Sequence, residues 1–161
     1  MDVLWAPWRM EYILSDGKEP GCILCTDDDR IIDEDRLILF VGQKTIVIMN
    51  KYPYINGHLL VAPKRHVDGL DKLTEEESLD LLVMVRKSID ILKKVFKAEG
   101  FNVGLNLGKV AGAGVEEHMH FHIVPRWLGD TNYMTVFAEV RVIPEHIKET
   151  YKKLKPHFED I

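Results

Sequence analysis

Cysteines and long apolar stretches are scarce in this chain. Only 2 of its 161 residues are cysteine, too few for a framework of several disulfides. No apolar run approaches the roughly 20 residues that a membrane-spanning helix needs. The start, MDVLWAPWRM, has no basic segment followed by an apolar one, so we expect no secretory signal. These absences predict a cytoplasmic protein that does not interact with membranes.

Positive charge is also in deficit. The sequence has 21 Lys and Arg residues against 26 Asp and Glu residues, which gives a formal net charge of −5. Because this balance does not favour polyanions, we expect no nucleic-acid partner, and any phosphate site must be built locally. The length of 161 residues and the hydrophobic content of 46% predict a single domain, residues 1–161, that buries its core without disulfides.

Five short apolar segments separated by turn residues predict β-strands. They are Leu37–Val41, Thr45–Met49, His58–Pro63, Asn102–Leu107 and His118–Pro125. These strands cluster in the sequence instead of alternating with helices. That order predicts an α+β fold with an antiparallel sheet of about five strands.

One long helix is predicted between the third and fourth strands. Thr74 and Glu77 form a capping-box pattern at its start, and Gly100 ends it. Pro144 is expected to open a short C-terminal helix. The apolar residues of the long helix recur at helical spacing; they are Leu79, Leu82, Val83, Ile89, Leu92 and Phe96.

Three of the seven histidines alternate in the stretch GVEEHMHFHIVPRW. On a strand, His118, His120 and His122 project to the same face. Each imidazole needs hydrogen-bond partners, so a face with three of them is not an ordinary core face. The pattern predicts a metal site or a catalytic site. One tetrahedral ion held by all three is awkward, because same-face positions lie about 7 Å apart along a strand.

The two cysteines stand in a C-x2-C motif, Cys22 and Cys25. A structural disulfide is not expected in a cytosolic chain, which leaves a redox pair, half of a zinc site or two idle thiols. The preceding Pro20-Gly21 and the following aspartates are typical of a loop knuckle rather than of a strand–helix redox motif. Zinc would need two further ligands, which histidine supplies in mixed sites.

A glycine-rich segment, LGKVAGAGVEE, directly precedes the histidines. Gly108, Gly112 and Gly114 leave main-chain amides uncovered, so the chain can wrap an anion. A flexible loop is the alternative interpretation. Beside a histidine nucleophile, such a loop indicates attack on phosphorus, with the amides holding phosphate oxygens.

The stretch His118-Met-His120-Phe-His122-Ile-Val resembles the signature of the histidine triad (HIT) superfamily of nucleotide hydrolases and transferases. The segments LWAPWRMEYI, NKYPYINGHLLVAPKRH and PRWLGDTNYM are similar to a prokaryotic branch close to the fragile-histidine-triad hydrolases. That branch includes diadenosine tetraphosphate phosphorylases. The resemblance implies a HIT fold, a homodimer and a small-molecule nucleotide substrate.

The resemblance also implies roles for individual residues. His120 corresponds to the nucleophile that attacks the α-phosphorus, His122 contacts the phosphate, and His58 supports the nucleophile. Asn50 matches the position that binds ribose hydroxyls, and Ile48 is expected to flank the base. Asn106 matches the amide that holds a phosphate or the leaving group. The main-chain amides of Gly112 and Gly114, in the glycine-rich segment described above, are expected to bind the nucleotide phosphates.

The resemblance implies a division of labour within the triad. Several members bind zinc through a C-x2-C pair, a histidine after a Pro-Lys segment and the first histidine of the triad. These residues are Cys22, Cys25, His66 and His118. The zinc is then structural, and no organic cofactor is expected.

The chain departs from the family pattern before the first histidine. Many members carry an amide or hydroxyl side chain there, whereas Ala113, Gly114 and Val115 stand here. The contacts to the leaving group are therefore left open.

The activity that the resemblance implies is cleavage of a dinucleoside polyphosphate or a related nucleotide ester through a nucleotidyl-histidine. The acceptor is left open: water gives a hydrolase, and inorganic phosphate gives a phosphorylase. The other alternative is a non-catalytic, zinc-stabilised nucleotide-binding module.

Overall fold

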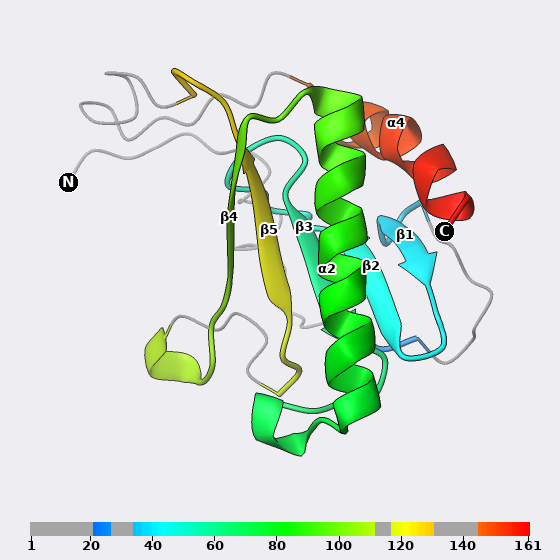
Figure 1. Cartoon of the computed structure of the whole chain (residues 1–161), viewed down its shortest axis with the longest axis vertical. Helices are drawn as coiled ribbons and strands as arrows, with labels where there is room; N and C mark the ends of the chain where they lie inside the picture. The colour runs from blue at the N-terminus through cyan, green and yellow to red at the C-terminus, as the bar shows by residue number, and fades with distance from the viewer. Residues whose placement is uncertain (1–20, 27–33, 112–116, 131–144) are drawn as a thin grey trace.

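The computed structural model describes residues 21–26, 34–111, 117–130 and 145–161. These residues form a five-stranded antiparallel sheet with two α-helices against one face (Figure 1). The predicted α+β architecture, with one long and one shorter C-terminal helix, is confirmed. In the described part of the chain, no helix is long and apolar enough to cross a membrane.

All five predicted strands are present. They are β1 (Ile38–Val41), β2 (Thr45–Met49), β3 (Leu59–Pro63), β4 (Gly100–Leu105) and β5 (Phe121–Arg126). Their order in the sheet is β1-β2-β3-β5-β4, with every neighbouring pair antiparallel. Strand β5 therefore lies inside the sheet, and β4 forms one edge. Strand β3 begins after His58, and β4 lies slightly earlier in the chain than predicted.

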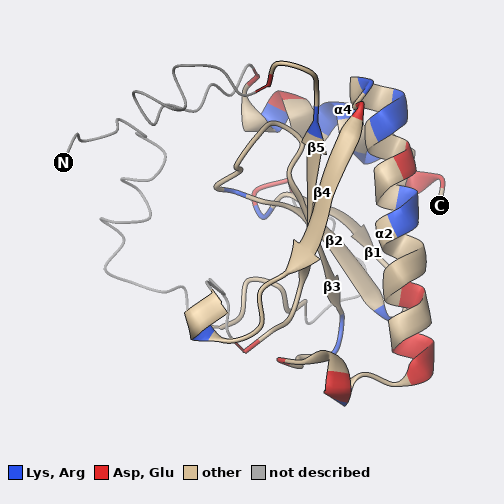
Figure 2. Ribbon diagram, turned by 60° about the vertical axis from the view of Figure 1, so that its left-hand side comes forward, with Lys and Arg blue, Asp and Glu red and all other residues tan. Residues whose placement is uncertain are grey.

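The long helix begins at the predicted capping box. The helices are α2 (Glu75–Phe96) and α4 (Ile147–Glu159), with the short 3-10 turns η1 (Leu70–Lys72) and η2 (Lys109–Ala111). The Glu77 main-chain N–H donates to the Thr74 hydroxyl at 3.2 Å, and the Thr74 N–H donates to the Glu77 carboxylate at 2.9 Å. Acidic residues in the first turn and lysines in the last turn of α2 complement the helix dipole (Figure 2).

The end and the buried face of α2 differ from the sequence pattern. The helix ends before Gly100, because Lys97 adopts a left-handed conformation with φ 54°. Leu79 and Leu82 are 66% and 58% exposed. Leu92 is buried as predicted, and Ile89 and Phe96 pack partly buried against the same core. The rest of the buried face consists of Leu81, Met84, Val85, Ser88 and Ile91. Because α2 carries apolar residues on two adjacent sides, helical spacing alone does not identify the side that meets the sheet.

Apolar side chains cover both faces of the sheet. On one face, Leu59, Val61 and Ile123 pack with α2 and α4. The hydroxyl of Tyr151 in α4 donates to the Ile38 carbonyl at 3.0 Å and ties this helix to β1. Pro144, the expected start of the helix, lies outside the described residues. A smaller buried cluster on the opposite face comprises Leu24, Ile38, Ile46, Ile48, Leu60 and Ala62.

The strand register aligns this smaller cluster with a histidine. Ile48 pairs with Leu60, Leu60 with His122, and His122 with Gly104. Directly paired residues point to the same face of a sheet. The row therefore leads from the apolar cluster to His122 and on to a glycine, on the face that the helices leave uncovered.

Strand β5 begins later than predicted. It starts at Phe121, so His118 and His120 precede it instead of lying within it. The main-chain N–H of Met119 donates to the Val67 carbonyl, in the loop after β3, at 2.7 Å. This bond holds the segment before β5 against that loop, so His118 and His120 lie in an irregular segment and not in a strand.

Candidate functional site

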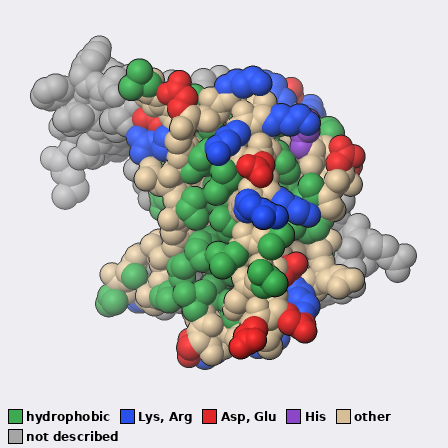
Figure 3. Space-filling view, viewed as in Figure 1, with side chains coloured by type: hydrophobic (Ala, Val, Ile, Leu, Met, Phe, Trp, Pro, Cys, Tyr) green, Lys and Arg blue, Asp and Glu red, His purple; other side chains and the backbone are tan. Residues whose placement is uncertain are grey.

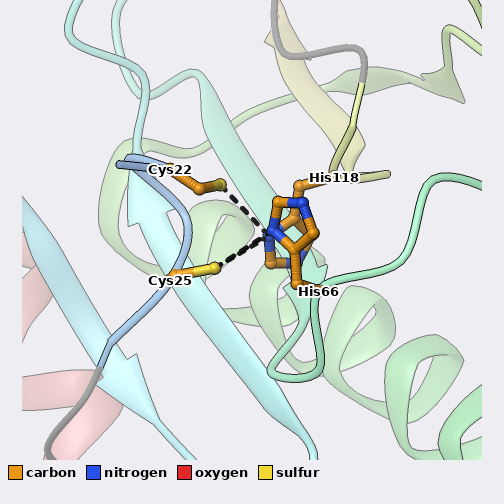
Figure 4. Close-up of side chains that lie close together, drawn as sticks. All are labelled: Cys22, Cys25, His66 and His118. Carbon is orange, nitrogen blue, oxygen red and sulfur yellow. Dashed lines mark hydrogen bonds between the residues drawn. The ribbon is translucent and has the colours of Figure 1, made fainter. Parts of the chain in front are cut away.

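Four potential metal ligands from three segments converge beside the start of β5 (Figure 4). One ligand atom from each of Cys22, Cys25, His66 and His118 lies within 4.8 Å of the others. The sulfurs of Cys22 and Cys25 lie 3.3 and 3.5 Å from Nδ1 of His118. The Cys25 sulfur also lies 3.2 Å from Nδ1 of His66. The structure thus brings together all four predicted metal ligands.

The cysteine pair is held as the predicted loop knuckle. The Cys25 N–H donates to the Cys22 carbonyl at 3.1 Å, which forms a turn. Leu24, between the cysteines, is 1% exposed and belongs to the apolar cluster on the sheet face opposite the helices. The Arg36 guanidinium donates to the carbonyls of Ile23 and Cys25 at 3.0 and 2.7 Å. The knuckle is therefore anchored by the buried Leu24 side chain and by the hydrogen bonds that the Arg36 side chain donates to its carbonyls.

The hydrogen bonding of His118 suits a metal ligand. Its Nε2 lies 2.7 Å from the Pro63 carbonyl oxygen, and because a carbonyl only accepts, Nε2 carries the proton. Nδ1 then keeps its lone pair and faces the two sulfurs. Burial is the main cause that lowers the pKa of His118, which favours the neutral, metal-binding form. Two thiols and two imidazoles match the donor set of mixed Cys/His metal sites.

The main-chain carbonyl of His118 also holds the ring of His120 in place. The His120 side chain is 4% exposed, and its Nδ1 lies 2.9 Å from the His118 carbonyl oxygen. Nδ1 therefore carries the proton of the neutral ring, and Nε2 keeps its lone pair. An imidazole in this form can act as a nucleophile.

His122 and His58 form a hydrogen-bonded pair next to His120. The rings of His120 and His122 lie edge to face, with centroids 4.8 Å apart. Nδ1 of His122 lies 3.0 Å from Nε2 of His58, whose side chain is buried. Burial, with a smaller contribution from His120, lowers the pKa of His122 to about 4. His122 is therefore neutral at pH 7, and it lies between His58 and His120.

Two residues of the loop between β2 and β3 contact His58. Asn50, a predicted site residue, places its Nδ2 atom 3.2 Å from Nδ1 of His58. The ring of Tyr54 stacks on His58 with centroids 4.8 Å apart and an interplanar angle of 28°. Tyr54 is not among the site residues predicted from the sequence. The available signal is an aromatic residue close before His58 in NKYPYINGH.

The structure describes two of the four remaining residues that were predicted to contact the substrate. Ile48 lies in the apolar cluster on the sheet face opposite the helices. Asn106 directly follows β4. Gly112 and Gly114 lie outside the described residues. Beside His122, no described atom lies within 4 Å of where a side chain of Gly104 would begin. The described residues therefore leave the sheet face uncovered at Gly104, next to His122.

Comparison with known proteins finds relatives along most of the chain. The HIT domain family matches residues 32–127. The AP-4-A phosphorylase of Mycobacterium tuberculosis is 39% identical over 158 residues, covering 94% of this chain and 81% of that relative. The bis(5'-adenosyl)-triphosphatase of Dictyostelium discoideum is 33% identical over 130 residues, covering 76% and 86% of the two chains.

A solved structure also resembles this fold. The Zn-bound histidine triad family protein from Mycobacterium smegmatis superposes with a TM-score of 0.62 at 25% identity. The match covers 77% of this chain and 84% of that one.

Lowering the pH should destabilise the protein, because His122 is held in its neutral form. Unfolded His122 takes up a proton near pH 6.5, whereas the folded residue does so only near pH 4. The unfolded state binds more protons between these values, so the free energy of unfolding falls as the pH falls. For a half-buried ring we expect on the order of 1–2 kcal/mol. Denaturant titrations at several pH values measure the slope, and His122→Asn should reduce it; an unchanged slope would contradict this account.

Proposed function

Since the chain belongs to the HIT family, we propose that it cleaves dinucleoside polyphosphates, such as diadenosine tetraphosphate, through a nucleotidyl intermediate on His120. The observation that carries this proposal is the buried His120 ring, whose Nδ1 proton is held by the His118 carbonyl at 2.9 Å. That contact leaves Nε2 as the reactive atom. The names of the phosphorylase and triphosphatase relatives support the substrate class.

The reaction proceeds in two transfers. Nε2 of His120 attacks the α-phosphorus, a nitrogen–phosphorus bond forms, and the bond from phosphorus to the bridging oxygen breaks. With diadenosine tetraphosphate, ATP leaves and adenylate stays on His120. The His118 carbonyl keeps its bond to the Nδ1 proton and stabilises the positive charge that the ring gains.

The second transfer returns His120 to its starting form. Inorganic phosphate attacks the adenylate phosphorus and gives ADP, whereas water gives AMP. The 39% identity with a phosphorylase over 94% of the chain favours phosphate as the acceptor. An intact, buried His120 speaks against a purely non-catalytic nucleotide-binding module.

The other residues position the substrate in this proposal. His122 contacts the phosphate oxygens, and His58 supports His122. Asn106 and the amides of Gly112 and Gly114 hold the phosphate or the leaving group. The apolar cluster that contains Ile48 faces the base. Since His122 lies in the same row of the sheet as Ile48, the base and the reacting phosphate occupy neighbouring positions.

The proposed activity predicts specific products. Diadenosine tetraphosphate with phosphate should give ADP and ATP, and without phosphate the turnover should be much slower and give AMP and ATP. His120→Ala should lower kcat/KM by about 1000-fold or more, because the nucleophile is lost. Chromatography of the products measures both. His157→Ala, in α4, is the matched control; a His120→Ala protein that is folded and active would refute the mechanism.

We further propose that the metal held by Cys22, Cys25, His66 and His118 is zinc. The described donor atoms are two thiol sulfurs and two imidazole nitrogens, and His118 bonds through its other nitrogen to the Pro63 carbonyl. Such an outer contact orients metal-binding histidines in known sites. The thiols do not form a disulfide, which is consistent with a cytoplasmic, reducing location.

Protein purified without a histidine tag should contain about one zinc ion per chain. Cys25→Ser should lose most of the metal and lower the thermal midpoint of unfolding, because metal binding is coupled to folding. Elemental analysis and calorimetry measure these effects, with His157→Ala as a histidine control that keeps the metal. A wild-type protein with no stoichiometric metal would refute the zinc site.

Asn50 should make the enzyme discriminate sugars more strongly than purines. Its amide accepts from the Tyr52 N–H at 2.9 Å and donates toward His58. By this count one N–H and one lone pair remain for ribose hydroxyls. A 2′-deoxy substrate leaves such groups unpaired, whereas the apolar surface around Ile48 distinguishes adenine and guanine weakly. The comparison is kcat/KM for adenosine, guanosine and deoxyadenosine substrates, and equal rates on both sugars would contradict it.

We also propose a homodimer that uses β4 and α2. Strand β4 is an edge strand, and its central residues Asn102, Val103 and Gly104 are exposed. Val103 and Leu82 are 43% and 58% exposed. Figure 3 shows apolar side chains gathered between β4 and α2 on this face. Among the described residues no strand pairs with the outer side of β4, and an edge strand beside an apolar surface is suited to pairing with a second copy.

This interface can be tested with two substitutions. Val103→Asp and Leu82→Arg should shift the protein from dimer to monomer, because each places charge in the apolar contact. Light scattering after size-exclusion chromatography measures the mass. Leu70→Arg, at an exposed leucine in η1, should leave the dimer intact. A wild-type protein that is monomeric at micromolar concentration would rule out the proposal.

A further inference from the structure

We infer that Asn50 is a positioning residue that fixes which nitrogens of His58 and His122 carry protons, beyond its proposed contact with ribose. The consequence for catalysis rests on the proposed reaction at His120. The inference itself rests on a chain of hydrogen bonds whose direction is set by main-chain groups.

The chain begins with the orientation of the Asn50 amide. The main-chain N–H of Tyr52 lies 2.9 Å from Oδ1 of Asn50. Because a main-chain N–H only donates, the amide atom facing it must be the oxygen. The nitrogen end therefore faces His58, where Nδ2 lies 3.2 Å from Nδ1 of the ring. Asn50 donates this hydrogen bond.

A second donor meets the same nitrogen of His58. The main-chain N–H of Tyr54 lies 3.2 Å from Nδ1 of His58. With two N–H groups directed at it, Nδ1 must offer its lone pair and cannot carry a proton. The proton of His58 is therefore on Nε2. The ring is 1% exposed and stacked under Tyr54, so it is held in this orientation.

His58 passes this constraint to His122. Nε2 of His58 lies 3.0 Å from Nδ1 of His122, so the Nε2 proton is donated to that atom. Nδ1 of His122 is then an acceptor, and the proton of the neutral ring is on Nε2. Asn50, together with the Tyr54 N–H and acting through His58, thus determines that His122 presents an N–H donor at its remaining nitrogen.

The resulting pair of imidazoles is complementary. His120 keeps a lone pair on Nε2, because its Nδ1 proton is bonded to the His118 carbonyl. His122 carries a proton on Nε2. Phosphate oxygens only accept hydrogen bonds, so an N–H donor stabilises the charge that develops on them, while a lone pair would repel it. One ring is prepared to attack and its neighbour to hold the phosphate.

Asn50→Asp tests the inference, because it replaces the donor by an acceptor of similar shape. A carboxylate facing Nδ1 of His58 draws a proton to that atom. In ¹⁵N NMR spectra of the ligand-free protein, wild-type His58 should be protonated at Nε2 and bare at Nδ1, and Asn50→Asp should gain the Nδ1 proton. A wild-type His58 protonated at Nδ1, or a variant in which Nδ1 stays bare, would overturn the inference.

Kinetics separate this role from ribose binding. Asn50→Asp should lower kcat by about tenfold or more on ribose and 2′-deoxyribose substrates alike, with a smaller change in KM. A loss confined to the ribose substrate, or no loss on either, would show that Asn50 acts through the sugar or not at all, and would overturn the inference.

The control makes the same exchange outside the histidine pair. Gln43→Glu, at an exposed residue of the turn between β1 and β2, also replaces an amide by a carboxylate, and it should leave both the spectrum and kcat unchanged. If Asn50→Asp does not fold, the wild-type spectrum alone decides the proton positions. If the wild type transfers no nucleotide, the proposed function fails, while the spectra still decide this inference.

Discussion

The candidate site depends on His118, whose two ring nitrogens and main-chain carbonyl each contact a different part of the structure. Its Nδ1 faces the sulfurs of Cys22 and Cys25, and its Nε2 proton bonds to the Pro63 carbonyl. Its own carbonyl accepts the Nδ1 proton of His120. A single residue therefore connects the metal-binding group, the end of β3 and the proposed nucleophile. Any displacement of the His118 main chain therefore also moves the His120 ring that we propose as the nucleophile.

The two faces of the sheet carry different groups, and the candidate site lies on the face opposite the helices. The helices and most of the core occupy one face, and the other carries a small apolar cluster that leads to His122. The loop between β2 and β3 then covers His58 with Tyr54 and Asn50. Structural packing and the reactive groups are thus separated by the sheet, so polar rings can be assembled without interrupting the main core.

Local sequence signals predicted those parts of the fold that depend on local chemistry. The capping box of α2 forms as predicted, because Thr74 and Glu77 bond to each other's main chain. The buried side of α2 was not evident, because Leu82 and Leu81 both fit helical spacing and only contact with the sheet selects one. Likewise, β5 starts late because Met119 bonds to Val67, a contact between segments that are distant in the sequence.

The candidate site shows the same limit. The spacing of the alternating histidines and of the C-x2-C pair indicates a metal or catalytic site. The four predicted metal ligands converge as the family resemblance implies. The link from Asn50 to His58 requires a loop conformation that places two main-chain N–H groups. No pattern of residue types specifies that geometry, so Tyr54 and the direction of the hydrogen bonds emerge only from the fold.

The proposed reaction depends on an adenylate carried by Nε2 of His120. The most direct measurement mixes the enzyme with diadenosine tetraphosphate in the absence of phosphate, stops the reaction within milliseconds to seconds at alkaline pH, and maps the modified peptide by mass spectrometry. The account predicts one adenylate on the peptide that contains His120, and its disappearance with formation of ADP when phosphate is added before quenching. An adenylate on another residue, or product formation with no covalent adduct at any time, would contradict it.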